Sequence, residues 1–143
     1  MNQKLDRPDF DVIAGWMQPC ERVLDLGCGN GALLKFLIET RGVSGYGIDF
    51  DDANVLAAIR NGVNVIQSNI DAGLAGFGER AFDHVVLSRT LQTIRHTEKL
   101  LAEMLRVGRE AVVSFPNFGY WKNRQAVMDG RMPVSEDLPY QWR

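Results

Sequence analysis

Apolar residues alternate along the chain between compact runs and positions spaced three or four apart. The helical spacing after Pro8 predicts a short amphipathic helix through Phe10, Ile13 and Met17. The compact runs have the length and composition of buried strands, and stretches with helical periodicity lie between them. Strands are therefore expected at residues 22–26, 43–48, 63–67, 82–88 and 111–115.

Helices are expected to follow three of these strands. Asp51 or Asp52 is a candidate N-cap for the second helix, and Thr97 for the third. Gly42 follows the first helix at a position where a helix end favours positive φ. The apolar faces of the three helices are expected at Leu33, Leu34, Leu37 and Ile38, at Val55, Leu56 and Ile59, and at Leu100, Leu101, Met104 and Leu105.

The alternation of strands and helices predicts an α/β fold with a mostly parallel sheet covered on both faces. We expect a three-layer, Rossmann-like arrangement in a single domain over residues 1–143. A further helix is expected over 121–128, and Pro133 and Pro139 interrupt the segment after it. The residues after Phe115 are about as many as one more βα unit needs. The sequence therefore predicts a domain that is C-terminally incomplete and lacks its last strands.

Composition and charge narrow the functional classes. The chain has 16 Lys and Arg against 18 Asp and Glu, a formal net charge of -2 without a basic stripe, so we expect no nucleic-acid partner. Cys20 and Cys28 lack the companions that zinc needs, so we expect neither a metal site nor a disulfide framework. The N-terminus lacks a signal core, and no apolar run reaches the roughly 18 to 20 residues that cross a bilayer. We therefore expect a cytoplasmic protein without a membrane partner.

A glycine-rich loop, Asp25-Leu26-Gly27-Cys28-Gly29-Asn30-Gly31, follows the first expected strand. Ligands of parallel α/β sheets bind beyond the carboxyl ends of the strands, where this loop lies. Glycines let the backbone take unusual φ and ψ, so that main-chain N–H groups and the next helix N-terminus can face a ligand. The loop therefore predicts a binding site for a compact polar ligand.

The glycines by themselves allow two kinds of cofactor. The pattern Gly27-x-Gly29-x-x-Ala32 also satisfies the dinucleotide fingerprint, which would make the chain an NAD-dependent oxidoreductase. A carboxylate at Asp25 would repel a pyrophosphate but attract the ammonium and sulfonium groups of S-adenosylmethionine. The charge of Asp25 thus favours the methyl donor.

Asp49 ends the second expected strand, where a carboxylate can accept both hydroxyl groups of an adenosine ribose. Both cofactors contain this ribose, so Asp49 supports an adenosine cofactor without choosing between them. The alternative is a helix N-cap like Asp51. We favour the ribose role, because Asp49 directly follows a strand.

Residues 23–31, with Gly47-Ile48-Asp49 and 82–86, resemble the class I S-adenosylmethionine-dependent methyltransferases over most of the chain. More narrowly, segments 62–67, 106–110, 115–119 and 130–135 look like the MetW family of methionine-biosynthesis proteins. The resemblance implies S-adenosylmethionine or S-adenosylhomocysteine as cofactor. The residues expected to bind it are Asp25, Gly27, Cys28, Gly29, Asn30, Gly31, Asp49, Phe50, Asn69, Ile70 and Ser88.

The resemblance also implies a bacterial protein that works with homoserine O-acyltransferase at the entry to methionine synthesis. Two departures leave its own methyl transfer open. Asn69 stands where the superfamily commonly has an aspartate against adenine, although its amide can still donate and accept hydrogen bonds. After the fourth expected strand, many small-molecule methyltransferases of this type carry a His pair, whereas this chain has Leu91-Gln92-Thr93, and Gln92 cannot act as a base near neutral pH. An active small-molecule methyltransferase is the alternative function.

Candidate catalytic groups are few. Methyl transfer needs an oriented acceptor and, for hydroxyl or ammonium acceptors, a base. His84 lies in an apolar strand, which indicates a structural role, whereas His96 precedes a helix and is either a general base or a surface or capping residue. Arg89 could meet an acidic substrate or be a solvated or locally paired side chain. The aromatic segment 118–121 could cover the site, contact another protein or pack under a loop.

Overall fold

The computed structural model describes residues 7–133 and contains one parallel five-stranded sheet. Its strands are β1 (Arg22–Leu26), β2 (Ser44–Asp49), β3 (Val65–Gln67), β4 (Phe82–Ser88) and β5 (Gly108–Ser114). The order across the sheet is β3-β2-β1-β4-β5, and every pair of neighbours is parallel. The expected α/β class with a mostly parallel sheet is confirmed.

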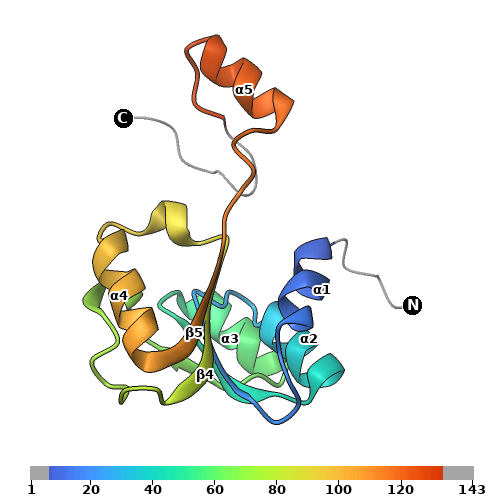
Figure 1. Cartoon of the computed structure of the whole chain (residues 1–143), viewed down its shortest axis with the longest axis vertical. Helices are drawn as coiled ribbons and strands as arrows, with labels where there is room; N and C mark the ends of the chain where they lie inside the picture. The colour runs from blue at the N-terminus through green and yellow to red at the C-terminus, as the bar shows by residue number, and fades with distance from the viewer. Residues whose placement is uncertain (1–6, 134–143) are drawn as a thin grey trace.

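Helices cover both faces of this sheet (Figure 1). Helices α1 (Pro8–Gly15), α2 (Ala32–Arg41) and α3 (Asp52–Arg60) lie on one face, and α4 (Thr97–Val107) lies on the other. Two short 3-10 helices, η1 (Ile70–Ala72) and η2 (Leu91–Thr93), precede β4 and α4. The last helix, α5 (Trp121–Met128), stands apart beyond the end of β5 and has no buried residue. Within residues 7–133, no helix combines the length and apolar character needed to cross a membrane.

Strand β1 lies in the middle of the sheet and divides its side chains between two cores. Leu24 and Leu26 pack in the cluster under α4, whereas Val23 packs in the cluster under α1 and α2. Successive side chains of a strand point to opposite faces, so Asp25 shares the face of Val23. This alternation places a carboxyl group under α1 and α2, at the carboxyl end of the central strand.

The chain reverses its direction across the sheet between β1 and β4. Strands β1, β2 and β3 proceed to one edge, after which β4 returns to the other side of β1 and β5 follows it outward. In open α/β sheets such a switch point leaves a crevice beyond the carboxyl ends of the two central strands. The fold therefore directs the loops after β1 and β4 toward one site.

Helix α3 buries a different face from the one its apolar pattern predicts. Leu56 and Ile59 are 54% and 57% exposed, and Ala58 is the buried residue of this helix. The expected inner face is therefore wrong for these leucine and isoleucine side chains. Next to α3 the sheet ends in β3, which has three residues, so there is little surface for large apolar side chains to cover. Asp51 caps the helix by accepting a hydrogen bond from Asn54 N.

The start of α4 also differs from the expectation. Thr97 is the first residue of the helix rather than its cap, and His96 occupies the cap position without a side-chain hydrogen bond. The Thr97 hydroxyl instead donates to Ile94 O at 3.4 Å. Leu100 and Met104 are buried as expected, but Leu105 is 64% exposed because it lies on the outer side of the helix.

Candidate cofactor site

The glycine-rich loop after β1 is built on three left-handed residues. Gly27, Gly29 and Gly31 have φ values of 66°, 56° and 76°. A Cβ atom would lie 2.9 Å from Thr90 Cγ2 at Gly27 and 3.0 Å from Val63 Cγ2 at Gly31. At Gly29 a Cβ atom would meet nothing within 4 Å. The backbone at Gly29 therefore faces open space, where a ligand can approach it closely.

Cys28 fixes this loop against β2. Its N–H donates to Ile48 O at 2.9 Å, and a Cβ atom at Gly47 would lie 2.5 Å from its Sγ atom. Burial, with the nearby charges of Asp25 and Asp49, raises the pKa of the Cys28 thiol to about 12. The thiol is therefore protonated near neutral pH and packs against the sheet rather than serving as a nucleophile.

Asp49 ties the glycine loop to the start of α3. One carboxylate oxygen accepts a hydrogen bond from Gly29 N at 2.9 Å, and the other accepts from Asp51 N at 3.0 Å and Asn54 Nδ2 at 3.3 Å. The side chain is 7% exposed. Because Asp51 supplies the N-cap of α3, the alternative capping role for Asp49 is wrong. The carboxylate positions the loop.

A cavity of about 250 Å³ opens at the switch point between β1 and β4. It brings together six of the residues expected at a cofactor site, namely Asp25, Gly27, Cys28, Gly29, Asn30 and Ser88. Its other lining residues are Arg7, Phe10, Ala32, Leu33 and Arg89. The cavity thus joins the loops after β1 and β4 with the start of α1 and α2.

Asp25 is the buried charged group of this cavity. It is 2% exposed, and none of the residues that the structure describes donates a hydrogen bond to its carboxyl group. Burial, and secondly the charge of Asp49, raises the pKa of Asp25 to about 7, against a lowering effect of Arg7. A cationic group in the cavity would stabilise the ionised carboxylate by Coulomb attraction in a water-poor setting.

Two arginines from distant parts of the chain line the same cavity. Arg7, just before α1, stacks on the Phe10 ring with its Cζ atom 4.5 Å from the ring centroid. Arg89 follows β4 with a left-handed φ of 54°, and its N–H donates to Ser114 O at 2.9 Å. Sequence patterns assign Arg7 no role, because only the packing of α1 against α2 brings it to the glycine loop. The periodicity of α1 could predict a helix but not this location.

Several other expected residues lie elsewhere. Gly31 is the last residue of the loop but does not line the first cavity, and Ile70 lines a second cavity of about 320 Å³ with Ile48 and Ile66. Phe50 is 70% exposed beside Asp49, and Asn69 caps η1 by accepting from Asp71 N at 2.9 Å. His96, the candidate base, is exposed at the start of α4 and is not among the residues that line the first cavity.

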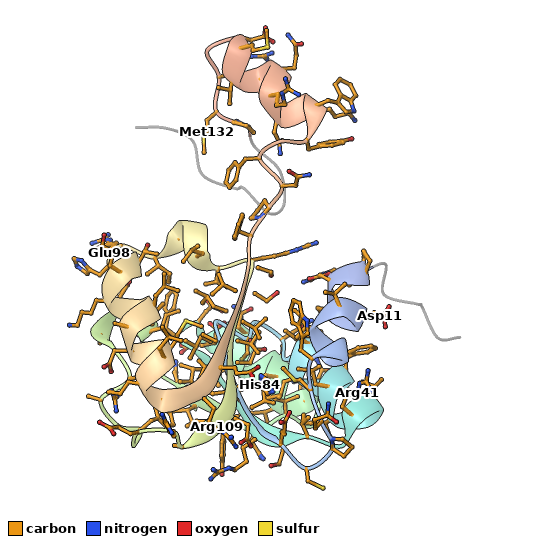
Figure 2. The ribbon with its side chains drawn as sticks, in the orientation of Figure 1. Asp11, Arg41, His84, Glu98, Arg109 and Met132 are labelled. Atoms are coloured by element: carbon orange, nitrogen blue, oxygen red, sulfur yellow. The ribbon has the colours of Figure 1, made fainter. Side chains whose placement is uncertain are left out.

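His84 lies near the amino end of β4, at the opposite end of the sheet from the glycine loop (Figure 2). It is 3% exposed, with Nε2 2.9 Å from Glu21 Oε2 and Nδ1 3.6 Å from Glu110 Oε2. These contacts link β4 to β5 and to the residue before β1, which fits the structural role expected for it. In the part of the chain that is described, no three His, Cys, Asp or Glu side chains are grouped to hold a metal ion.

The sheet order, the glycine loop after β1 and the carboxylate after β2 define the fold of class I S-adenosylmethionine-dependent methyltransferases. A methyltransferase of Thermotoga maritima, described as a possible histamine N-methyltransferase, has a TM-score of 0.69 at 17% identity, covering 85% of this chain and 56% of its own. A Geobacter sulfurreducens methyltransferase in complex with S-adenosyl-L-homocysteine has a TM-score of 0.59 at 19% identity, covering 74% and 47%. The model of the family described as methionine biosynthesis protein MetW matches residues 7–143, and the chain belongs to this family.

A curated relative supports the same assignment. The bifunctional methionine biosynthesis protein MetXA/MetW of Rhodopirellula baltica is 39% identical over 130 residues, which cover 84% of this chain. The match covers 21% of the relative, so the chain spans about a fifth of its length. In that protein a MetXA part and a MetW part are joined in one chain.

Proposed function

We propose that this chain binds S-adenosylmethionine or S-adenosylhomocysteine and acts with homoserine O-acyltransferase in methionine biosynthesis. The observation that carries the proposal is the Rhodopirellula baltica relative, in which the MetXA and MetW names belong to one polypeptide. When two proteins are fused in one chain, each encounters the other at a high effective concentration. The MetXA name denotes a homoserine O-acyltransferase, so a separate acyltransferase of that family is the partner we propose for this chain.

The donor half of the proposal is supported by the chemistry of the first cavity. Asp25 supplies a buried carboxyl group for the cationic methionyl end of the donor. Gly29 lines the same cavity and has no side chain there, so the donor can approach its backbone. We assign the ribose hydroxyls to Asp49, since a carboxylate has about four lone-pair sites and three protein donors use part of them. Phe50, Asn69 and Ile70 follow β2 and β3, and we assign them to the adenine side.

Methyl transfer to a small molecule is the second candidate function, favoured by the methyltransferase fold. The bound donor would supply a methyl group activated by its sulfonium. The residues of this chain would then orient an acceptor in the cavity, with water excluded by Phe10 and Leu33. Asp25 is the carboxyl group in the cavity lining that could take up a proton from the acceptor, whereas His96 is not part of the lining. Labelled methyl transfer to a metabolite extract would detect this activity.

The test of the first proposal is an acyltransferase assay with and without this chain, together with copurification of the two proteins. We expect the chain to copurify with homoserine O-acyltransferase and to change its rate. An acyltransferase that neither binds the chain nor responds to it would contradict the partnership. Calorimetry with S-adenosylmethionine, S-adenosylhomocysteine and NAD tests the donor half, and preference for NAD would restore the oxidoreductase alternative.

A further inference from the structure

The chain after β5 leaves the body of the molecule and ends in a helix that stands apart from the sheet (Figure 1). We call residues 115–131 the α5 arm, which consists of a loop followed by α5. Hydrogen bonds inside the arm shape it, since Tyr120 N donates to Asn117 O at 3.1 Å and Arg131 N to Ala126 O at 2.8 Å. None of the α5 residues is buried. The arm therefore has a defined shape without being packed into a core.

The α5 arm carries a group of large apolar side chains that are between 45% and 79% exposed. They are Phe115, Phe118, Tyr120, Trp121, Val127 and Met128. A helix of eight residues is marginally stable in water unless its apolar face packs against another surface. Contiguous exposed apolar side chains are typical of surfaces that bind another protein. The arm therefore has the properties of a docking element.

The arm does not cover either of the two cavities described above. None of the residues that line the first cavity belongs to the arm, and none of those that line the second does. The aromatic side chains of segment 118–121 are also too exposed to be packed under a loop. Of the three roles expected for this segment, contact with another protein is the one that its position favours.

The arm is basic as well as apolar, in a chain whose formal net charge is -2. It contains Lys122, Arg124 and Arg131, and its one carboxylate, Asp129, pairs with Arg131 at 3.0 Å. Among the residues that the structure describes, no carboxylate forms an ion pair with Lys122 or Arg124. The Lys122 ammonium lies 5.6 Å from the centroid of the Trp121 ring. By charge complementarity, these two cations fit a partner surface with carboxylates beside an apolar groove.

We propose that the α5 arm docks into an apolar groove with an acidic rim on homoserine O-acyltransferase. This inference rests on the proposed function, which supplies the partner. The MetW family model matches residues 7–143, so the arm lies within the part of the chain that defines the family. In the Rhodopirellula baltica relative, a MetW part is joined to a MetXA part in one chain. A helix that lays its apolar side chains into a groove is a recurrent mode of protein recognition.

The first experiment measures amide hydrogen exchange of the wild-type chain, alone and with purified homoserine O-acyltransferase. In the free chain the arm amides should exchange fast, because the arm has no buried side chain in α5 to hold the helix closed. The acyltransferase should slow exchange within residues 117–131 by about tenfold or more. The amides of α4, whose inner side chains pack in a core, are the internal control and should not change. Protection confined to other surfaces would overturn the inference.

The second experiment compares two exposed tryptophans by calorimetry against the acyltransferase. Trp121 is 64% exposed in the arm, and Trp16, at the end of α1, is 54% exposed and serves as the matched control. Trp121→Ser should weaken binding by about 30-fold or more, as expected for an aromatic residue that anchors an interface. Trp16→Ser should bind as wild type does. The melting temperature of Trp121→Ser should stay near that of wild type, because its side chain packs in no core.

The third experiment tests the charge of the partner groove. Arg124→Glu should slow association with the acyltransferase and flatten the dependence of the rate on salt, because cations at an interface steer an acidic partner. Arg41→Glu, an equal change of charge at the exposed end of α2, should leave the rate and its salt dependence as in wild type. Association rates at low and high salt give the comparison. The same salt dependence in both variants would overturn the acidic rim.

The possible failures separate this inference from the proposed function. A wild-type chain that does not bind the acyltransferase would overturn the partnership and the docking site with it. Binding that Trp121→Ser leaves unchanged, without protection of the arm, would overturn the docking site and leave the partnership intact. Self-association of the chain that Trp121→Ser abolishes would overturn the acyltransferase as occupant in favour of a second copy. Weaker binding of S-adenosylmethionine to Trp121→Ser would instead make the arm a cover of the first cavity.

Discussion

Two buried carboxyl groups, Asp25 and Asp49, lie close together at the ends of β1 and β2 and differ in their hydrogen bonding. Three donors hold Asp49, whereas the carboxyl group of Asp25 receives none from the residues that the structure describes. Hydrogen bonds to an ionised carboxylate stabilise it, and burial without them favours the neutral acid. Asp49 is therefore a fixed part of the loop, and Asp25 is a group whose charge a ligand can change.

The raised pKa of Asp25, about 7, predicts pH-dependent donor binding. Below this pH the Asp25 carboxyl group is neutral. S-adenosylmethionine must then either bind beside an uncharged group or displace the proton from Asp25. Its affinity should therefore rise from about pH 5.5 to 7, by at most about tenfold per unit. S-adenosylhomocysteine, which lacks the sulfonium charge, should show a smaller rise. Calorimetry across this range tests the slope, and an Asp25→Asn variant with the same slope as wild type would contradict the assignment.

The same pKa shift acts on stability in the absence of a ligand. The folded-state pKa of Asp25 lies above its unfolded value of about 3.8, so the unfolded chain loses this proton first as pH rises. Asp25 therefore contributes a loss of stability that develops between about pH 4 and 7, at most about 4 kcal/mol for a shift of this size. Asp25→Asn should raise the free energy of unfolding at pH 7 but not near pH 4. Urea unfolding at both pH values measures the difference.

Asp49→Ala should weaken S-adenosylmethionine binding by about 2 to 4 kcal/mol, because it removes the acceptor assigned to both ribose hydroxyls and the anchor of Gly29 N. Calorimetry measures this loss. Asp51→Ala is the matched control, since Asp51 caps α3 and should cost about 1 kcal/mol of stability without changing donor affinity. If Asp49→Ala bound the donor as tightly as Asp51→Ala does, Asp49 would have no role in the site.

Among the elements, the close pairing of β1 with β2 determines where the glycine loop and Asp49 meet. Gly45 pairs with Val23, and a Cβ atom at Gly45 would lie 1.9 Å from Val23 O. An alanine side chain there cannot be accommodated without moving one strand away from the other. The distance from Gly29 N to the Asp49 carboxylate depends on the same pairing, since these residues follow the ends of β1 and β2.

Gly45→Ala should therefore lower the melting temperature by a large amount or prevent folding, because the substitution separates two central strands. Gly15→Ala is the matched control, since Gly15 ends α1 and a Cβ atom there meets nothing within 4 Å. Alanine at this helical position should change stability by less than about 1 kcal/mol, in the favourable direction. Thermal unfolding of the two variants gives the comparison, and equal melting temperatures would show that β1 and β2 can separate at little cost.

At the scale of the whole molecule, local signals in the sequence predict the sheet and the glycine-rich loop. They do not predict which side chains come together at the first cavity. Strands 22–26 and 82–88 are confirmed to the residue, because compact apolar runs with clear ends need no tertiary context. Which face of α3 is buried depends instead on the short edge strand beside it. Arg7 and Arg89 meet at Asp9 only through the packing of α1 onto α2 and the left-handed turn after β4. Such a cluster of distant residues leaves no periodic signal in a single sequence.

Donor binding and the partnership with homoserine O-acyltransferase can be tested separately, because Asp25 is buried and does not form part of the surface that a partner protein would contact. Asp25 is 2% exposed, so Asp25→Asn should leave every contact with homoserine O-acyltransferase unchanged while it alters donor binding. We expect this variant to copurify with the acyltransferase as wild type does. If the acyltransferase rate responds to S-adenosylmethionine only through the wild-type chain, donor binding regulates the partner. By linkage, the acyltransferase must then change the donor affinity of this chain by the same factor that the donor changes partner affinity. Copurification that Asp25→Asn abolishes would instead mean that the carboxyl group is needed for the fold on which the partner docks.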